Sequence, residues 1–174
     1  MIYNPAFDLY HCVYRFLLMI GKIAENNSLE VDRLRIYDFF YLFPYKITNV
    51  KTKKSESALR KSKKEICVEK INPYNEIKED RIIFERLKSY QLSALKYIAS
   101  YGVIDSDQLI ENIIKIKDKN KLDNFISLFE KSSKDSNDST IINWLFENLN
   151  SIPMSGEYGL KHRTNLMEWK YDLS

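Results

Sequence analysis

Apolar residues recur at three- and four-residue steps along most of the chain, which is the spacing of one face of an α-helix. The first run covers Leu9–Ile23 and follows Asn4-Pro5, where Asn suits the N-cap and Pro the first helical position. This helix is expected to end near Asn26-Asn27. A second helix is predicted to begin at the cap Ser28 and to end at Pro44, because proline disfavours helical backbone in the residue before it.

The second half of the chain shows the same spacing between clear capping signals. A long helix is predicted over about residues 79–101, with Gly102 as its C-cap. The segment Asp105–Gln108 is a capping box, which predicts a helix from there through Ile116. Two more helices are predicted further on: Leu122–Phe129 and Ile141–Leu149.

The C-terminal segment has a different pattern. Gly156–Gly159 is typical of a turn, and the residues after it alternate partially in polarity, as strands do. We therefore predict one or two strands between Leu160 and Tyr171. Helix, turn, helix, helix and a short hairpin is the element order of a winged-helix module. The predicted fold is mainly α, a helical bundle whose C-terminal half is winged-helix-like and ends in a short β-hairpin.

Composition agrees with a helical, globular protein. The chain of 174 residues has 4 Gly and 4 Pro, fewer than a turn-rich all-β fold needs, and 44% hydrophobic residues, enough for a core. Its longest apolar run, Phe16–Ile20, is far shorter than the roughly 20 residues of a membrane span. The N-terminus lacks the basic region and cleavage site of a signal peptide. We therefore expect a cytoplasmic protein whose two cysteines, Cys12 and Cys67, are buried free thiols.

Positive charge is concentrated in one segment. Residues 51–64 contain seven cationic side chains and a single anionic one, Glu56. The segment therefore has a net charge of +6, whereas the whole chain carries +3. This segment is interpreted as a mobile linker or a solvated helix, separated from the C-terminal part of the chain by Asn72-Pro73. The predicted organisation has three parts: an N-terminal helical pair over 1–49, a basic linker over 50–72, and a winged-helix-like helical domain with its hairpin over 73–174.

The sequence offers little for catalysis. Its four glycines are scattered and form no phosphate loop. His11-Cys12 does not suit a thiolate–imidazole pair, because neighbouring helical side chains point about 100° apart. The paired carboxylates Glu79-Asp80 and Asp105/Asp107 lie in first turns of predicted helices, where capping explains them. No His or Cys spacing fits a metal. The prediction is a protein without enzymatic activity, catalytic residues, metal or cofactor.

The basic residues are the best binding candidates, because clustered Lys and Arg neutralise phosphates and release counterions. A second basic group, Lys161-His162-Arg163, lies where a wing would project. A solvated loop, a site for acidic protein surfaces, or edge-strand charges that prevent aggregation are the alternatives. No aromatic residue is interleaved between Lys51 and Lys64, so base stacking is not indicated. The nucleic-acid-binding candidates are Lys51, Lys53, Lys54, Arg60, Lys61, Lys63, Lys64, Lys161 and Arg163.

Three segments together resemble a known family: Tyr3–Asp8 with Tyr10-His11, Leu34–Pro44, and Gly159–Glu168. They resemble the small middle-component proteins of bacterial ABC-three-component systems, which are related to Lamassu-type antiphage defence. The resemblance runs in order across nearly the whole chain. Its motifs are short and not catalytic, and the basic insert between Ile47 and Asn72 has no counterpart in them.

The resemblance implies an adaptor in a bacterial antiphage or antiplasmid defence complex. Such systems are similar in having an SMC/Rad50-like ATPase, an effector that is often a nuclease, and a small middle protein. The middle protein would join the two and couple DNA sensing to effector release. The implied partners are the ATPase and the effector of the same operon, with the DNA backbone as a further candidate and with no membrane or small-molecule substrate.

Exposed aromatic residues would make good anchors for such an interface. The candidates are Phe39, Phe40, Tyr41, Phe43 and Tyr45, most of which a core position would also explain. A different class of function also fits the helical order, the wing-like tail and the basic segment. That alternative is a stand-alone winged-helix DNA-binding transcriptional regulator.

Overall fold

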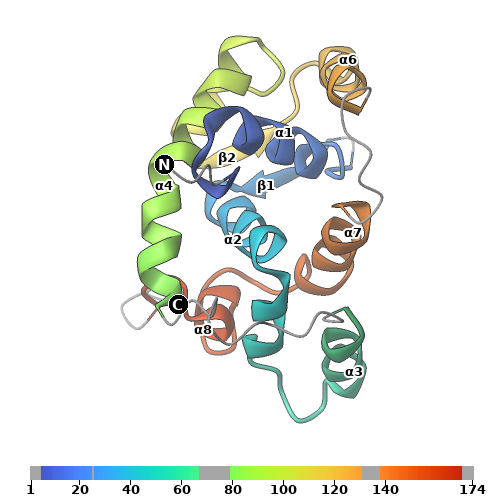
Figure 1. Cartoon of the computed structure of the whole chain (residues 1–174), viewed down its shortest axis with the longest axis vertical. Coiled ribbons are helices and arrows are strands. Elements are labelled where there is room, and N and C mark those ends of the chain that lie inside the picture. Colours follow the sequence, from blue (N-terminus) through green and yellow to red (C-terminus); the bar gives the residue numbers. More distant parts are fainter. Residues whose placement is uncertain (1–4, 25, 67–78, 131–137, 170–174) are drawn as a thin grey trace. The chain divides into compact units, whose positions relative to one another are not determined.

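The computed structural model describes residues 5–24, 26–66, 79–130 and 138–169 (Figure 1). The fold is mainly α, as predicted, with a small two-stranded antiparallel sheet. The helices are the 3₁₀ helices η1 (Pro5–Phe7) and η2 (Pro44–Asn49), and α1 (Leu9–Ile20), α2 (Val31–Leu42), α3 (Ser57–Ile66), α4 (Asp80–Ser100), α5 (Ser106–Ile110), α6 (Lys119–Glu130), α7 (Asp138–Leu149) and α8 (Leu160–Thr164). The strands are β1 (Ser28–Glu30) and β2 (Ile113–Lys115).

The chain forms two compact units, each built from two separate segments. Unit 1 consists of Met1–Asp38 and Arg86–Ser136, and unit 2 of Phe39–Glu85 and Asn137–Ser174. Helices α2 and α4 therefore contribute residues to both units. The three-part division into 1–49, 50–72 and 73–174 stays a prediction.

Unit 1 is organised around α1 and the small sheet. Asp8 caps α1 by accepting a hydrogen bond from the backbone N–H of His11 at 2.9 Å, and α1 packs against α6. The strands pair antiparallel, with Leu29 opposite Ile114, and both of these side chains are buried. Burial of such apolar side chains supplies most of the stabilisation.

A polar network crosses the core of unit 1. Asp38, which is completely buried, accepts hydrogen bonds from Arg15 Nε, from Arg15 Nη2 at 3.2 Å and from Gln91 Nε2 at 2.9 Å. Arg35 Nε donates to Gln91 Oε1 at 3.0 Å. The charges compensate one another, so the core can hold them away from water.

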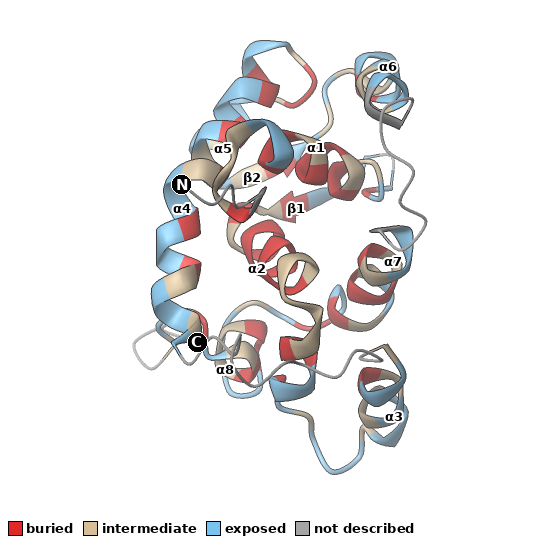
Figure 2. Ribbon diagram, in the orientation of Figure 1, coloured by how far each residue is buried: buried red, intermediate tan, exposed pale blue. Residues whose placement is uncertain are grey.

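Unit 2 is held by aromatic and aliphatic packing. The Phe39 ring meets the edge of Phe84 with centroids 6.1 Å apart, and both side chains are completely buried. Helix α3 contacts η2 and α7. Figure 2 shows the contrast between the largely buried α2 and the largely exposed outer face of α3.

Helix boundaries in the first half differ from the prediction, and α1 already ends at Ile20 instead of near Asn26-Asn27. Asp8 rather than Asn4 caps α1, and Pro5 opens the short η1 instead; Asn4 itself lies outside the described residues. Ser28 does not cap a helix but begins β1, whose partner β2 lies far along the chain. Non-local pairing of this kind overrides the local capping signal.

The helix predicted from Asp105 through Ile116 is also shorter than expected. Asp105 does cap α5, accepting from the backbone N–H groups of Asp107 and Gln108, but α5 ends at Ile110. The next residues turn through Asn112, which has a positive φ of 59°, and then form β2. Ile113–Lys115 therefore belongs to a strand that pairs with β1.

The predicted C-terminal hairpin is wrong for the described residues. Residues Leu160–Thr164 form α8, and Asn165 ends it in the left-handed conformation with φ 54°. Leu160 and Arg163 are both buried and, at a spacing of three, lie on the same face of α8, whereas in a strand they would point to opposite faces. Residues 165–169 contain no strand, and 170–171 lie outside the described part. The winged-helix arrangement of the C-terminal half is not confirmed.

No helix in the described ranges combines the length and the apolar character that crossing a membrane requires.

Candidate partner-binding site

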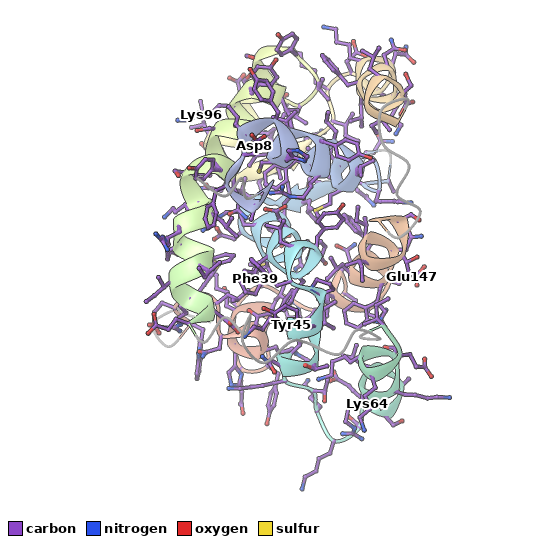
Figure 3. The ribbon with its side chains drawn as sticks, viewed as in Figure 1. Asp8, Phe39, Tyr45, Lys64, Lys96 and Glu147 are labelled. Carbon is purple, nitrogen blue, oxygen red and sulfur yellow. The ribbon has the colours of Figure 1, made fainter. Side chains whose placement is uncertain are left out.

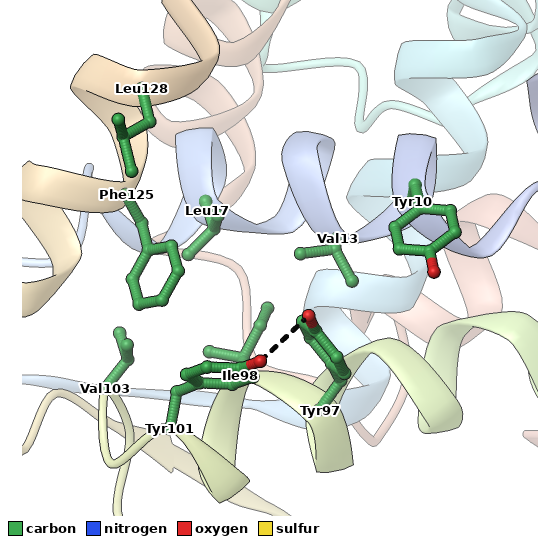
Figure 4. A pocket seen from close by; sticks show the side chains of 9 residues that line it. All are labelled: Tyr10, Val13, Leu17, Tyr97, Ile98, Tyr101, Val103, Phe125 and Leu128. Atoms are coloured by element: carbon green, nitrogen blue, oxygen red, sulfur yellow. Dashed lines mark hydrogen bonds between the residues drawn. The ribbon is translucent and has the colours of Figure 1, made fainter.

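Unit 1 carries an apolar pocket of about 300 Å³ between α1, the end of α4 and α6 (Figure 4). We call it the tyrosine pocket. Its lining residues are Tyr10, Val13, Leu17, Tyr97, Ile98, Tyr101, Val103, Phe125 and Leu128. All of these side chains are apolar or aromatic, which suits the binding of another apolar surface rather than acid–base chemistry.

Helical spacing brings these side chains to the pocket. Val13 and Leu17 lie one turn apart on α1. Tyr97 lies in the last turn of α4, and Tyr101 follows four residues later, directly after the helix ends. The chain then reverses at Gly102, which adopts φ +72° as the predicted C-cap.

The reversal at Gly102 is a Schellman motif, since Gly102 N–H donates to Ala99 O at 2.8 Å and Val103 N–H donates to Ile98 O at 3.4 Å. The motif brings the buried side chains of Ile98 and Val103 to the same wall of the pocket.

The tyrosines form the exposed rim. Among the described residues, seven large hydrophobic side chains are exposed, and four of them line this pocket: Tyr10, Tyr97, Tyr101 and Leu128. The Tyr97 and Tyr101 hydroxyls are 3.2 Å apart, and the hydrogen bond between them raises the pKa of Tyr97 (Figure 4). The Tyr101 ring also meets Phe125 edge-on with centroids 5.4 Å apart. The pocket therefore combines an apolar floor with hydroxyl groups at its edge.

The predicted interface aromatics divide into two groups. Phe39 and Phe40 are buried in unit 2 and serve the core. Tyr41, Phe43 and Tyr45 are half-buried, so the prediction that they contact a partner stays open for them. The periodicity of α4 predicted its apolar stripe but did not mark Tyr97 and Tyr101 as exposed. Their spacing of four was the available signal.

The basic segment is partly helical. Lys51, Lys53 and Lys54 are exposed in the loop before α3, and Lys61 is exposed on α3. Lys64 is also exposed on α3 (Figure 3). Lys63 is buried and donates to the backbone carbonyls of Thr48 and Val50.

Arg60 ties the loop to α3. It donates to Lys53 O at 3.0 Å and to Lys54 O at 2.8 Å. The described part of this segment is thus an ordered loop and an amphipathic helix.

The two basic groups come together in unit 2. Arg163 is buried and donates to Glu56 with both terminal nitrogens, at 2.7 and 2.9 Å, while its Nε donates to Tyr158 O. Lys51 N–H donates to Arg163 O at 2.9 Å, and Lys161 is half-buried on α8. The guanidinium of Arg163 lowers the pKa of Glu56. Arg163 therefore has internal partners, whereas the exposed lysines remain nucleic-acid-binding candidates.

The other side chains that the sequence analysis considered for catalysis or metal binding are the cysteines and the possible metal ligands. Cys12 is a buried free thiol, and burial, assisted by the nearby Asp38 carboxylate, raises its pKa. Cys67 lies outside the described residues. Across the described ranges, no group of three or more His, Cys, Asp or Glu side chains is placed to hold a metal ion.

Comparison with known proteins gives one match. A family model described as "ABC-three component (ABC-3C) system Middle Component 5" matches residues 1–172. No curated protein and no solved structure matches the chain significantly. The family match covers nearly the whole chain and agrees with the resemblance carried by its short motifs. The chain therefore belongs to the Middle Component 5 family of ABC-three-component systems.

Proposed function

We propose that this middle component is a non-enzymatic adaptor that links an SMC/Rad50-like ATPase to an effector, a nuclease in our proposal, in a cytoplasmic antiphage or antiplasmid defence complex. Membership of the family supports a role among several components. The tyrosine pocket is the surface that we assign to one of these partners.

The observation that carries the proposal is the clustering of exposed apolar side chains at one pocket. Tyr10 is 68% exposed and Leu128 is 63% exposed, and both border the same apolar floor. Isolated exposed apolar residues are common, but a cluster around a concave site is typical of a protein interface. Tyrosine suits such sites because it buries a large ring and keeps a hydroxyl for hydrogen bonding.

The pocket would accept one or two apolar side chains of the partner. A volume of about 300 Å³ holds groups of that size, and the Tyr97 and Tyr101 hydroxyls can bond to polar atoms at the edge. Removing Tyr10 and Leu128 from water on binding would supply the favourable hydrophobic free energy.

The test is co-purification of the full chain with the products of its two neighbouring genes in moderate salt, comparing two matched variants. Leu128→Asp places a carboxylate in the pocket, and Ile110→Asp places one on another exposed aliphatic position, 77% exposed, outside it. We expect Leu128→Asp to weaken partner binding by about tenfold or more and Ile110→Asp to leave it unchanged.

Two results would contradict the proposal. A wild-type chain that stays monomeric and binds neither neighbouring protein would remove the adaptor role. Equal binding by the wild type and Leu128→Asp would keep the adaptor role but remove the tyrosine pocket from its interface.

A further inference from the structure

Unit 2 places exposed lysines beside a row of aromatic rings. Lys53 Nζ lies 5.2 Å from the centroid of the Tyr158 ring, and that ring lies 5.7 Å from the His162 ring. His162 in turn stacks on Trp169, with centroids 4.2 Å apart and planes 36° apart. We call Lys51, Lys53, Lys54, Tyr158, His162 and Trp169 the lysine–aromatic face.

Hydrogen bonds of Glu56 and Arg163 hold the two halves of this face together. The Glu56 carboxylate accepts from the backbone N–H of Lys53 at 2.8 Å and from both terminal nitrogens of Arg163. Arg163 also donates to the carbonyl of Tyr158. The pair therefore fixes the lysine loop and the aromatic segment in one arrangement, although Glu56 and Arg163 are 107 positions apart in the sequence.

The aromatic segment is itself held in an unusual conformation. Tyr158 has a positive φ of 64°, which costs a non-glycine residue free energy. Its backbone N–H donates to His162 Nδ1 at 3.1 Å. Despite this backbone conformation, Tyr158 is 40% exposed. Trp169 is half-buried beside His162. An aromatic residue kept exposed in a strained backbone is better explained by a ligand than by the core.

We propose that the lysine–aromatic face binds single-stranded nucleic acid. Lysines that follow a strand's phosphates and aromatic rings on which bases stack are the two components of such sites. Duplex DNA presents the same phosphates but keeps its bases stacked on one another, so the rings favour a single strand. An acidic protein segment would use the lysines but gain nothing from Trp169. This inference is independent of the adaptor role assigned to the tyrosine pocket.

The test measures binding of the full chain to fluorescent single strands of thymidine or uridine and to a duplex of equal length. Titrations at several salt concentrations give the number of phosphates neutralised. Trp144 and Trp169 are the two tryptophans of the chain. In the variant Trp144→Phe, the remaining tryptophan fluorescence comes from Trp169 alone and reports its surroundings directly.

We expect either single strand to bind more tightly than the duplex and to quench Trp169. Trp169→Ala should weaken single-strand binding about five- to a hundredfold, whereas Trp169→Phe keeps a stacking ring and most of the affinity. Combined Lys51→Ala, Lys53→Ala and Lys54→Ala should lower the slope of log affinity against log salt by about two. A control triple, Lys88→Ala, Lys96→Ala and Lys117→Ala, removes three exposed charges of unit 1 and should leave binding unchanged.

Three outcomes would overturn the proposal. One is the absence of single-strand binding at low salt. The second is equal binding of duplex and single strand with no effect of Trp169→Ala, which would reduce the site to non-specific charge. The third is displacement of the strand by polyglutamate of equal charge at equal concentration, which would identify an acidic protein segment as the ligand. Circular dichroism of each variant distinguishes loss of the site from loss of the fold.

Discussion

At the scale of single residues, Asp38 is central to the buried polar network of unit 1. Its carboxylate has no exposed surface and is satisfied by Arg15 and Gln91. A buried charge is tolerated only when its partners are in place, because an ion left without them retains its full desolvation cost. The sequence did not reveal that Arg15 and Gln91 would meet Asp38, because they lie on other helices.

Asp38→Ala is expected to lower the free energy of unfolding by about 3–5 kcal/mol, since it removes the buried carboxylate that pairs with the buried Arg15. Urea denaturation followed by circular dichroism measures this change. The matched control is Asp123→Ala, which removes an exposed pair with Lys119 at 3.1 Å and should cost less than about 1 kcal/mol. Equal costs for the two variants would show that the Asp38 network does not stabilise the core.

At the scale of elements, local signals predicted helices well and strands poorly. Asp105 and Gly102 act as the caps that their sequence positions predict, because capping depends on a few neighbouring residues. Strands β1 and β2 are three residues each and exist through pairing with each other across the chain. A pattern of so few residues carries no reliable period, so Ile113 and Ile116 fitted a helix equally well.

For the candidate sites too, local features could be predicted from the sequence and contacts between distant segments could not. Exposed lysines could be identified from charge alone, but their neighbours Tyr158, His162 and Trp169 could not, because the fold brings together distant segments. The segment from Leu160 to Tyr171 was predicted as strand because only its local pattern could be used. The alternation at Leu160 and His162 could be seen in the sequence, whereas the pairing of Arg163 with Glu56 could not.

The Glu56–Arg163 pair links the loop before α3 to α8 and makes unit 2 sensitive to acid. Hydrogen bonding to Arg163 is the main cause that lowers the pKa of Glu56. A lowered folded-state pKa stabilises the fold above the unfolded value of about 4.3, and this stabilisation is lost as the pH falls through the folded value. At pH 7, Glu56→Gln should cost about 1–3 kcal/mol, and its difference from the wild type should shrink toward zero in acid.

Tryptophan fluorescence measures this prediction selectively, because Trp144 and Trp169 both belong to unit 2. Denaturant titrations between about pH 7 and pH 3 give the two stability curves. A difference between Glu56→Gln and the wild type that stays constant over this range would show that the ionised carboxylate contributes nothing.

At the scale of the whole molecule, the interleaving of segments is the main feature. The chain passes between units after Asp38, after Glu85 and after Ser136. Residues 1–85 contain α1, β1 and α2 but lack β2, α6 and the Gln91 that completes the Asp38 network.

We therefore expect the fragments 1–85 and 73–174 to remain unfolded when produced separately, because in each fragment both units lack all or most of one of their two segments. Circular dichroism and limited proteolysis of the fragments, compared with the full chain, measure this. A cooperatively folded fragment 73–174 would instead support the three-part division that the sequence predicts.

The same interleaving sets an order during translation. Unit 1 has both of its segments once residue 136 has been added, whereas unit 2 requires residues 137–174 as well. At about 5–20 residues per second, adding those residues takes roughly 2 to 8 seconds. The nascent chain thus contains every residue of the tyrosine pocket before α8 and Trp169 are added, so unit 1 can complete its fold ahead of unit 2.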